Sequence, residues 1–361
     1  MTPARGLTEA GRARIEAVAR EHLDRGWHTG AQVAVYRDGA LAVDVQVGEA
    51  AGKRMLWFSA TKPVTAVAVL MLVERGAVDL DAPIAAIWPE FAQGGKGACT
   101  VRHVLTHQGG FPVLPRSFDW AHIDDWDAAA AETASIEATW APGTDAGYHP
   151  VTYGFALGEV IRRTDGRTPR EFFRDEIFGP LGMDASLGTD DPDGVLLPQA
   201  MSEVTLQDPD GVEARTSDIV RRFVAPSTLR AQMPAANGIG TAAALARFYA
   251  LLAAGGELDG VRLLSRETVA EATRAHVTSD MDRTSGLPSS YGLGFLVGGI
   301  FPPFDEPGVF GHSGQQCAIS YADPARGLAV AYLTNGLHDP YVVQVRTEEM
   351  AWAIREACAE G

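Results

Sequence analysis

The sequence predicts an α/β (α+β) fold in which an antiparallel sheet flanked by helices is interrupted by a mostly helical lobe. Strand-like stretches lie near both ends of the 361-residue chain, within residues 30–47 and 291–333. Between them, helical patterns alternate with loops rich in Pro, Gly, Asp and Trp. A chain of this length buries a large core and commonly divides into two lobes. We therefore expect a discontinuous α/β domain of residues 1–78 with 231–361, and a mostly helical domain of residues 79–230.

The N-terminal part of the chain predicts a helix followed by a β-hairpin. Residues 8–25 place apolar side chains on one side and charged side chains on the other at helical spacing. Residues 30–36 and 41–47 are predicted strands, and the turn residues Arg37-Asp38-Gly39 between them predict a tight connection.

A buried helix is predicted directly after this hairpin. Residues 64–73 are apolar on nearly every face, and Gly76 supplies a stop. Because Pro63 is tolerated only in the first turn of a helix, the helix must begin near Ser59. Residues at i and i+3 share a helix face, so the Ser59 hydroxyl and the Lys62 amine are expected to meet. This pair is typical of a nucleophile beside its base, but the S-x-x-K pattern alone is common, so its meaning depends on partner motifs.

The remaining elements are predicted from the same periodicities. Helices are predicted at residues 101–107, 128–139, 153–163, 169–177, 241–255 and 341–358. Strands are predicted at residues 291–297, 317–322 and 328–333, with a turn at Asp323-Pro324. The return of strands after the helical region is the reason for placing both chain ends in one domain.

The composition is that of an acidic globular protein. Hydrophobic residues make up 46% of the chain and the net charge is −16, which argues against nucleic acid or an anionic membrane as a partner. Residues 1–20 lack the apolar core of a signal peptide, and no run of about 18 apolar residues predicts a membrane span. Cys99, Cys317 and Cys358 are widely spaced and are expected to be free thiols in a reducing compartment. We therefore expect a cytoplasmic protein with a small-molecule substrate, and assembly into a homo-oligomer stays open.

Several motif-like stretches have simpler interpretations. His103 and His107 have the i, i+4 spacing of a metal-binding pair, but no H-E-x-x-H glutamate lies between them, so no metal is expected. His107 is expected to anchor a loop. Residues 238–243 mimic a dinucleotide-binding fingerprint without the strand that should precede it. Residues 311–314 lack the G-x-S-x-G order of the α/β-hydrolase elbow.

Two motifs complete a set of three with the serine-lysine pair. The loop 142–154 places Tyr148 just before a predicted helix, and His312-Ser313-Gly314 precedes a predicted strand. Together, the three motifs resemble the serine hydrolases related to class C β-lactamases and D-Ala-D-Ala peptidases, and within them the family VIII carboxylesterases. Supporting stretches are residues 104–110, 237–242 and 291–295. The resemblance spans roughly residues 30 to 335, in the order of the family.

This resemblance implies a β-lactamase/penicillin-binding-protein-like fold and a set of site residues, with no metal or cofactor. Ser59 matches the acylated nucleophile, Lys62 its activating partner, and Tyr148 the tyrosine that shares the general-base role. The backbone N–H groups of Ser59 and Gln315 are implied as the oxyanion hole. Substrate contacts are implied for His312, Ser313, Gly314, Gln108, His149 and Asn237.

Acyl transfer explains these residue types. A free lysine has a pKa of about 10.4, and burial beneath the serine helix would lower the pKa of Lys62. The Lys62 ammonium would in turn lower the pKa of Tyr148, so that the two groups share a proton and titrate together. Ser59 would attack an acyl carbonyl, and each oxyanion-hole donor is worth about 3–4 kcal/mol. Water would then hydrolyse the acyl-enzyme.

Two departures from the β-lactamase pattern favour esters over β-lactams and peptides. Pro150 stands where the resemblance implies an asparagine that holds the substrate amide, and His312 replaces a lysine that would meet a β-lactam carboxylate. The sequence therefore predicts a serine esterase, a carboxylic ester hydrolase acting on small to medium esters. An acyltransferase of the same fold, a D-amino-acid amidase, peptidase or β-lactamase, and a non-catalytic binding protein remain open alternatives.

Overall fold

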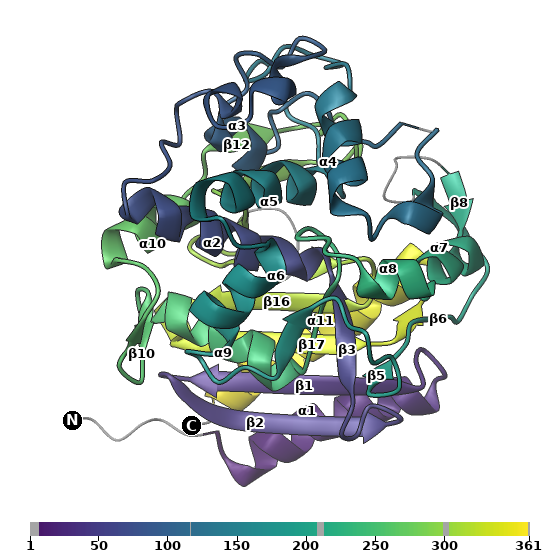
Figure 1. The fold of residues 1–361 in the computed structure, drawn as a ribbon. Helices are drawn as coiled ribbons and strands as arrows, with labels where there is room; N and C mark the ends of the chain where they lie inside the picture. Colours follow the sequence, from purple (N-terminus) through teal and green to yellow (C-terminus); the bar gives the residue numbers. More distant parts are fainter. Residues whose placement is uncertain (1–6, 116, 208–212, 299–302, 360–361) are drawn as a thin grey trace.

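An eight-stranded antiparallel sheet brings the two ends of the chain together, as the strand patterns predicted (Figure 1). The computed structural model describes residues 7–115, 117–207, 213–298 and 303–359. Strand order in the sheet is β12-β13-β14-β15-β16-β17-β1-β2. The N-terminal hairpin of β1 (Gly30–Arg37) and β2 (Ala40–Gly48) is therefore paired, through β1, with β17 (Leu328–Thr334). The other strands are β12 (Val277–Ser279), β13 (Ser289–Tyr291), β14 (Leu296–Val297), β15 (Phe310–Gly314) and β16 (Ala318–Asp323).

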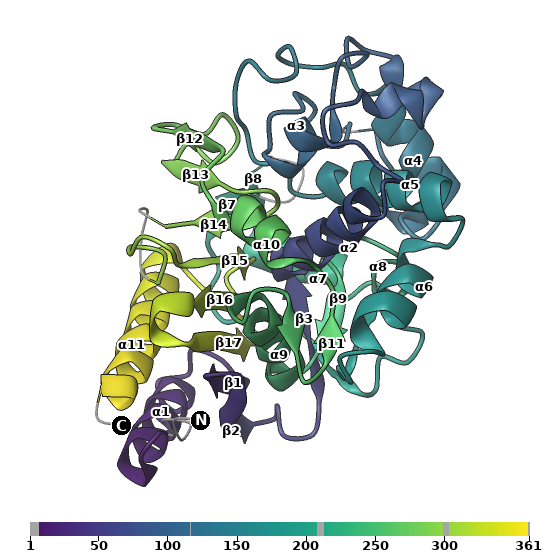
Figure 2. The ribbon, with the colours of Figure 1, turned by 90° about the vertical axis from the view of Figure 1, so that its left-hand side faces the viewer.

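Helices cover both faces of this sheet. The terminal helices α1 (Glu9–Asp24) and α11 (Pro340–Ala359) lie side by side on one face (Figure 2). Ile15 of α1 and Ile354 of α11 join Ile319 and Tyr332 of the sheet in one apolar cluster. On the other face, α9 (Ala242–Ala253) packs on the central strands. The amphipathic pattern of residues 8–25 is explained by this arrangement.

The serine helix α2 (Lys62–Glu74) connects the sheet to the helical lobe (Figure 2). Its residues from Lys62 to Leu72 are all buried, which explains the absence of a polar face in the sequence. It packs against α5 of the lobe. The helices of the lobe are α3 (Val101–Leu105), α4 (Trp126–Ser135), α5 (Thr152–Asp165), α6 (Pro169–Phe173), α7 (Thr216–Phe223) and α8 (Pro226–Arg230), and α10 (Arg266–Thr273) follows later in the chain.

The predicted helical region also contains short strands that the sequence did not indicate. A second sheet has the order β4-β9-β3-β5, and β6 pairs with β18. The strands of this second sheet are β3 (Arg54–Phe58), β4 (Ala185–Leu187), β5 (Val195–Leu196) and β9 (Gly238–Gly240). The remaining short strands are β6 (Gln199–Ala200), β7 (Thr205–Gln207), β8 (Glu213–Arg215), β10 (Glu257–Leu258), β11 (Val261–Arg262) and β18 (Gly336–Leu337). Strands this short show no measurable alternation. Their pairing ties residues 185–200 to the terminal parts of the chain, and the domain boundaries at residues 78 and 230 stay a prediction.

The predicted strand 291–297 is wrong, because two strands and a turn occupy this stretch. β13 ends at Tyr291, β14 begins at Leu296, and Gly292 N–H donates to the Phe295 carbonyl at 2.8 Å. The turn requires Gly294, which has a φ of +84° and whose added Cβ would lie 2.4 Å from the Ala66 side chain. The other predicted strands and helices of the sheet region are present with slightly shifted ends.

The three cysteines, Cys99, Cys317 and Cys358, are buried and unpaired, as expected for free thiols. Within the described ranges, no helix combines the length and apolar character needed to cross a membrane.

Candidate active site

Ser59 lies at a sharp junction between strand β3 and helix α2. Strand β3 ends at Phe58, whose φ of +48° is uncommon for a residue with a side chain. One 3₁₀ turn, Ser59–Thr61, then leads into α2. The Thr61 hydroxyl fixes this junction, since it donates to the Phe58 carbonyl at 2.6 Å and accepts the Gly238 N–H at 2.8 Å. The structure thus confirms that a helical turn begins at Ser59.

The Lys62 amine is fully buried beside the Ser59 hydroxyl. Its Nζ lies 3.1 Å from Ser59 Oγ, 2.7 Å from the Pro150 carbonyl and 3.2 Å from the Ala235 carbonyl. Burial holds the pKa of Lys62 well below its usual value, in the predicted direction. A neutral amine has two N–H donors and one lone pair. The two carbonyls match the donors, so the lone pair is left for the proton of Ser59.

Tyr148 lies against the same pair. Lys62 Nζ is 4.7 Å from the centre of the Tyr148 ring, and Tyr148 and Ser59 line one cavity. Burial raises the pKa of Tyr148 above its usual value; the Ser59 side chain opposes this rise, and the negative charge of Asp282 adds to it. The expected lowering of the Tyr148 pKa by a Lys62 ammonium is therefore wrong. Burial thus favours the uncharged form of both groups, because it penalises the ammonium and the phenolate alike.

A small cavity of about 110 Å³ opens onto Ser59. Its walls combine aromatic and aliphatic side chains with a few hydroxyl groups. The lining residues are Phe58, Ser59, Tyr148, Pro150, Val151, Phe223, Ala236, Thr284, Ser285 and Gln315. The structure thus brings together both residues of the predicted oxyanion hole, Ser59 and Gln315; the direction of their N–H groups toward a substrate stays a prediction.

The turn after β15 is held close to the serine junction. At Gly314 an added Cβ would lie 2.1 Å from the Trp57 carbonyl oxygen, so only glycine allows β15 to approach this closely. Gln315 and Gln316 follow with φ of +27° and +63°. Residues with side chains keep such positive φ angles only where surrounding contacts hold the main chain in place. Here the buried guanidinium of Arg346, on α11, donates to the Gln316 carbonyl.

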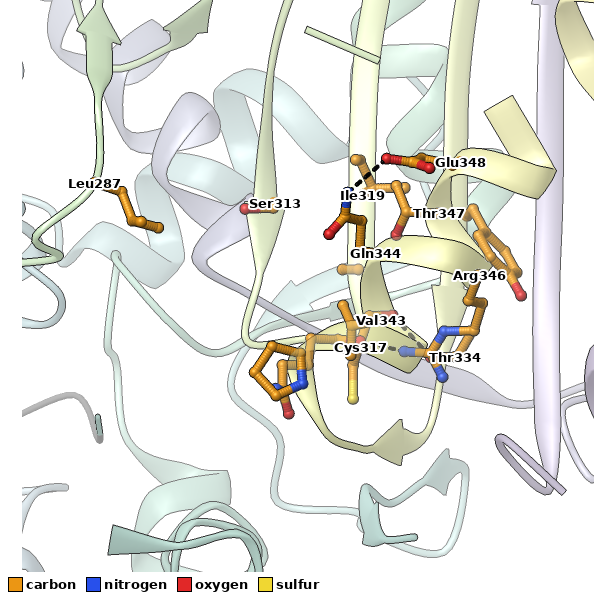
Figure 3. A pocket seen from close by; sticks show the side chains of 14 residues that line it. Leu287, Ser313, Cys317, Ile319, Thr334, Val343, Gln344, Arg346, Thr347 and Glu348 are labelled. Atoms are coloured by element: carbon orange, nitrogen blue, oxygen red, sulfur yellow. Dashed lines mark hydrogen bonds between the residues drawn. The ribbon is translucent and has the colours of Figure 1, made fainter. Parts of the chain in front are cut away.

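The side chains of His312 and Ser313 lie in different environments. His312 is buried with its ring centre 6.0 Å from that of Tyr148, and burial lowers its pKa to about 3, so it is neutral at pH 7. Ser313 instead lines a larger cavity of about 420 Å³ between β15, β16 and α11 (Figure 3). This cavity is also lined by Gln344, which donates to Glu348 at 2.9 Å.

Gln108 and His149 support loops and do not line the cavity at Ser59, and their expected substrate contacts stay a prediction. The buried His149 ring accepts the Phe111 N–H at 3.2 Å through Nε2, and its Nδ1 lies 2.6 Å from the Gly147 carbonyl. Gln108 donates to the Gly143 carbonyl at 3.4 Å. Both side chains therefore have their partners within the protein.

Asn237 is likewise a loop support in this structure. Its side chain is fully buried, and its Oδ1 accepts the Met233 N–H at 2.9 Å. Its Nδ2 donates to the carbonyls of Thr228 at 2.9 Å and Ala231 at 2.7 Å. Both Nδ2 hydrogens and one acceptor site of Oδ1 are thus used within the protein, and the expected substrate contact of this side chain stays a prediction.

His107 anchors a loop, as expected. Its Nδ1 accepts the His149 N–H at 3.0 Å, and its carbonyl accepts the Gly147 N–H at 3.0 Å. Among the residues that the structure describes, no cluster of three or more His, Cys, Asp or Glu side chains could hold a metal ion.

The sequence reasoning missed Asp282, a fully buried carboxylate next to Tyr148. Both its oxygens accept the Tyr148 N–H, at 3.0 and 2.9 Å. The sequence offers only an aspartate before Thr284 and Ser285, which is typical of an ordinary turn.

Known proteins resemble this chain over nearly its whole length. The family model described as Beta-lactamase matches residues 15–351. The chain is 33% identical over 352 residues to LipL, an esterase/beta-lactamase of Mycobacterium tuberculosis, covering 87% of this chain and 79% of that protein. It is 27% identical over 380 residues to the esterase EstB of Burkholderia gladioli, covering 92% and 94%. The crystal structure of a family VIII carboxylesterase matches with a TM-score of 0.83 at 26% identity, covering 98% of this chain and 99% of that one.

These matches confirm both the predicted resemblance and the predicted β-lactamase/penicillin-binding-protein-like fold. Because the family model matches residues 15–351 and LipL is 33% identical over most of the chain, the protein belongs to the Beta-lactamase family.

Proposed function

We propose that the protein is a serine hydrolase that cleaves small to medium carboxylic esters through an acyl-enzyme on Ser59. The observation that carries this proposal is the fully buried Lys62 amine, 3.1 Å from the Ser59 hydroxyl. A serine hydroxyl is a weak nucleophile until an adjacent base removes its proton. A lysine whose pKa is lowered by burial can act as such a base.

Acylation follows from this geometry. Lys62 takes the Ser59 proton as Ser59 Oγ forms a bond to the acyl carbon, and the carbonyl oxygen becomes an oxyanion that the N–H groups of Ser59 and Gln315 stabilise. The carbon–oxygen bond to the alcohol then breaks. Tyr148, which is protonated in the resting site, donates its proton to the departing alkoxide and regains one from Lys62. Water later repeats these steps in reverse and releases the acid.

The surroundings of the site favour ester substrates. The cavity at Ser59 is small and largely apolar, which suits an acyl group without charge. His312 is neutral at pH 7, so it offers no cation to a substrate carboxylate. The relatives LipL and EstB are named as esterases, which supports the same substrate class.

A covalent probe tests this proposal. Incubation with a fluorophosphonate is expected to give one equivalent of adduct on the peptide that carries Ser59, measured by mass spectrometry. A p-nitrophenyl ester should be hydrolysed by the same preparation, and prior labelling should stop that hydrolysis. An adduct on another residue, or hydrolysis that survives complete labelling of Ser59, would show that the proposed nucleophile is wrong.

Gly314→Ala is expected to lower kcat/KM for a p-nitrophenyl ester by about 10²-fold, the penalty typical of a misplacement of about 1 Å. The added Cβ would lie 2.1 Å from the Trp57 carbonyl oxygen, so β15 and the following Gln315 must move away from Ser59. Gly97→Ala is the matched control, because its added Cβ would meet nothing closer than 3.9 Å. Equal rates in the two variants would argue against a role for the β15 turn.

A further inference from the structure

The Asp282 carboxylate lies behind the catalytic tyrosine, in the connection between β12 and β13. It is fully buried, and both oxygens accept the Tyr148 N–H, at 3.0 and 2.9 Å. The Tyr291 hydroxyl donates to the same carboxylate at 2.9 Å. Asp282 therefore links the loop that carries Tyr148 to the end of strand β13.

The same carboxylate also shapes the wall of the cavity. It accepts the N–H groups of Thr284 at 2.9 Å and Ser285 at 2.8 Å. Both of these residues line the cavity at Ser59, as Tyr148 does. The Asp282 side chain thus holds the main chain of Tyr148 and that of residues 284–285 in fixed positions relative to each other.

The charge of Asp282 is notable because no cation pairs with it among the described residues. A buried carboxylate is tolerated only when hydrogen-bond donors satisfy its oxygens. Here the donors come from Tyr148, Tyr291, Thr284 and Ser285, so the ionised group orders all four. An ordinary turn requires only the contacts within the loop, whereas the contacts to Tyr148 and Tyr291 reach beyond it.

We propose that Asp282 is a positioning residue of the active site, whose carboxylate fixes the main chain of Tyr148 and so aligns the phenol with Ser59 and Lys62. This inference rests on the proposed function. Tyr148 has no regular secondary structure around it, since α5 begins only at Thr152. Its alignment must therefore come from side chains such as Asp282.

The electrostatic surroundings of Tyr148 provide a readout for this role. Lys62 Nζ lies 4.7 Å from the centre of the Tyr148 ring. The ring centres of His107 and His312 lie 4.7 and 6.0 Å from the same point. The phenols of Tyr153 and Tyr291 also face it. Burial lowers the pKa of Lys62, His107 and His312, which disfavours a positive charge on each of them. The charge of Asp282 raises the pKa of Tyr148 in addition to burial, so its removal should ease ionisation of the phenol.

Asp282→Asn, tested alone and combined with Tyr148→Phe, distinguishes positioning from simple structural support. Alone, it is expected to lower kcat/KM for a p-nitrophenyl ester by about 10²-fold, as a misplaced catalytic group does. The alkaline limb of its pH–rate profile should move to lower pH. In the Tyr148→Phe background, the same substitution should change the rate little, because no hydroxyl remains to be aligned.

The control is Asp145→Asn, in the same loop as Tyr148. Asp145 pairs with Arg283 at the surface and should leave the rate and the pH profile unchanged. An Asp282→Asn effect that is equally large in the Tyr148→Phe background, or an unmoved alkaline limb, would overturn the proposal. If Asp282→Asn does not fold, Tyr291→Phe removes one donor from the same carboxylate and must show the same non-additivity with Tyr148→Phe.

Failure of the two proposals can be told apart. If the parent protein is not labelled at Ser59 by the fluorophosphonate, the proposed function itself fails. If the parent is labelled and active while Asp282→Asn behaves like Asp145→Asn, only the role of Asp282 is refuted.

Discussion

Ser59→Ala is expected to abolish ester hydrolysis, lowering kcat/KM on the order of 10⁶-fold, as loss of the nucleophile does in other serine hydrolases. Without the hydroxyl, no acyl-enzyme can form, and the remaining N–H donors can only bind the ester. The fold should be unchanged, because a methyl group replaces a side chain at the edge of a cavity. Initial rates with a p-nitrophenyl ester and fluorophosphonate labelling measure the two consequences.

Ser285→Ala is the matched control for this variant. Ser285 is a second hydroxyl residue at the same cavity, but its contact with Asp282 is made by its main-chain N–H, which alanine keeps. We expect the rate to change by less than about tenfold, because a residue that only lines the cavity contributes far less to the reaction than the nucleophile does. A Ser59→Ala protein that hydrolyses and labels like the parent would refute the reaction class.

Lys62→Met is expected to lower kcat/KM by about 10⁴-fold, the upper range for loss of a general base. Methionine keeps the length of the side chain and removes the lone pair that faces Ser59. In the parent, the rate should rise with pH as Lys62 loses its proton, and this rise should lie well below the usual pKa of a lysine because burial lowers the pKa of Lys62. The rate should then stay level until Tyr148 ionises, above its usual pKa.

Lys96→Met provides the matched comparison, because Lys96 is another fully buried lysine. Its Nζ donates to the carbonyls of Gln93 at 2.9 Å, Ala134 at 2.9 Å and Ile136, in the helical lobe away from Ser59. This variant should lose about 1–3 kcal/mol of unfolding free energy, since buried carbonyls lose their donor. Its kcat should be close to that of the parent at a temperature where it is folded. Parallel losses of activity in both lysine variants would mean that Lys62 acts through stability alone.

Local backbone geometry is the reason why the proximity of Ser59 and Lys62 could be predicted from the sequence. Ser59 and Lys62 are three residues apart at the start of a helix whose position Pro63 sets, so their proximity needs no distant partner. The apolar sequence of the following helix likewise predicted its burial. The resemblance then added Tyr148 and the His312-Ser313-Gly314 motif, and the structure places Tyr148 beside Lys62.

The protonation of the site was decided by the tertiary structure. The sequence suggested that a Lys62 ammonium would lower the pKa of Tyr148, whereas burial raises it. Burial is the sum of contacts from segments far apart, such as the carbonyls of Pro150 and Ala235 around the Lys62 amine. No local pattern encodes that sum.

The support of the site was also decided by the tertiary structure. Asp282 meets Tyr148 across a separation of 134 residues, and its own sequence is that of a common turn. Conversely, the asparagine of the 237–242 stretch is used entirely by neighbouring carbonyl and N–H groups. The sequence by itself therefore determined the serine-lysine pair, the sheet formed by both chain ends and the family. Only the folded chain decided which polar side chains face the cavity at Ser59 and which hold the loops, because hydrogen bonds between distant segments leave no periodic trace in the sequence.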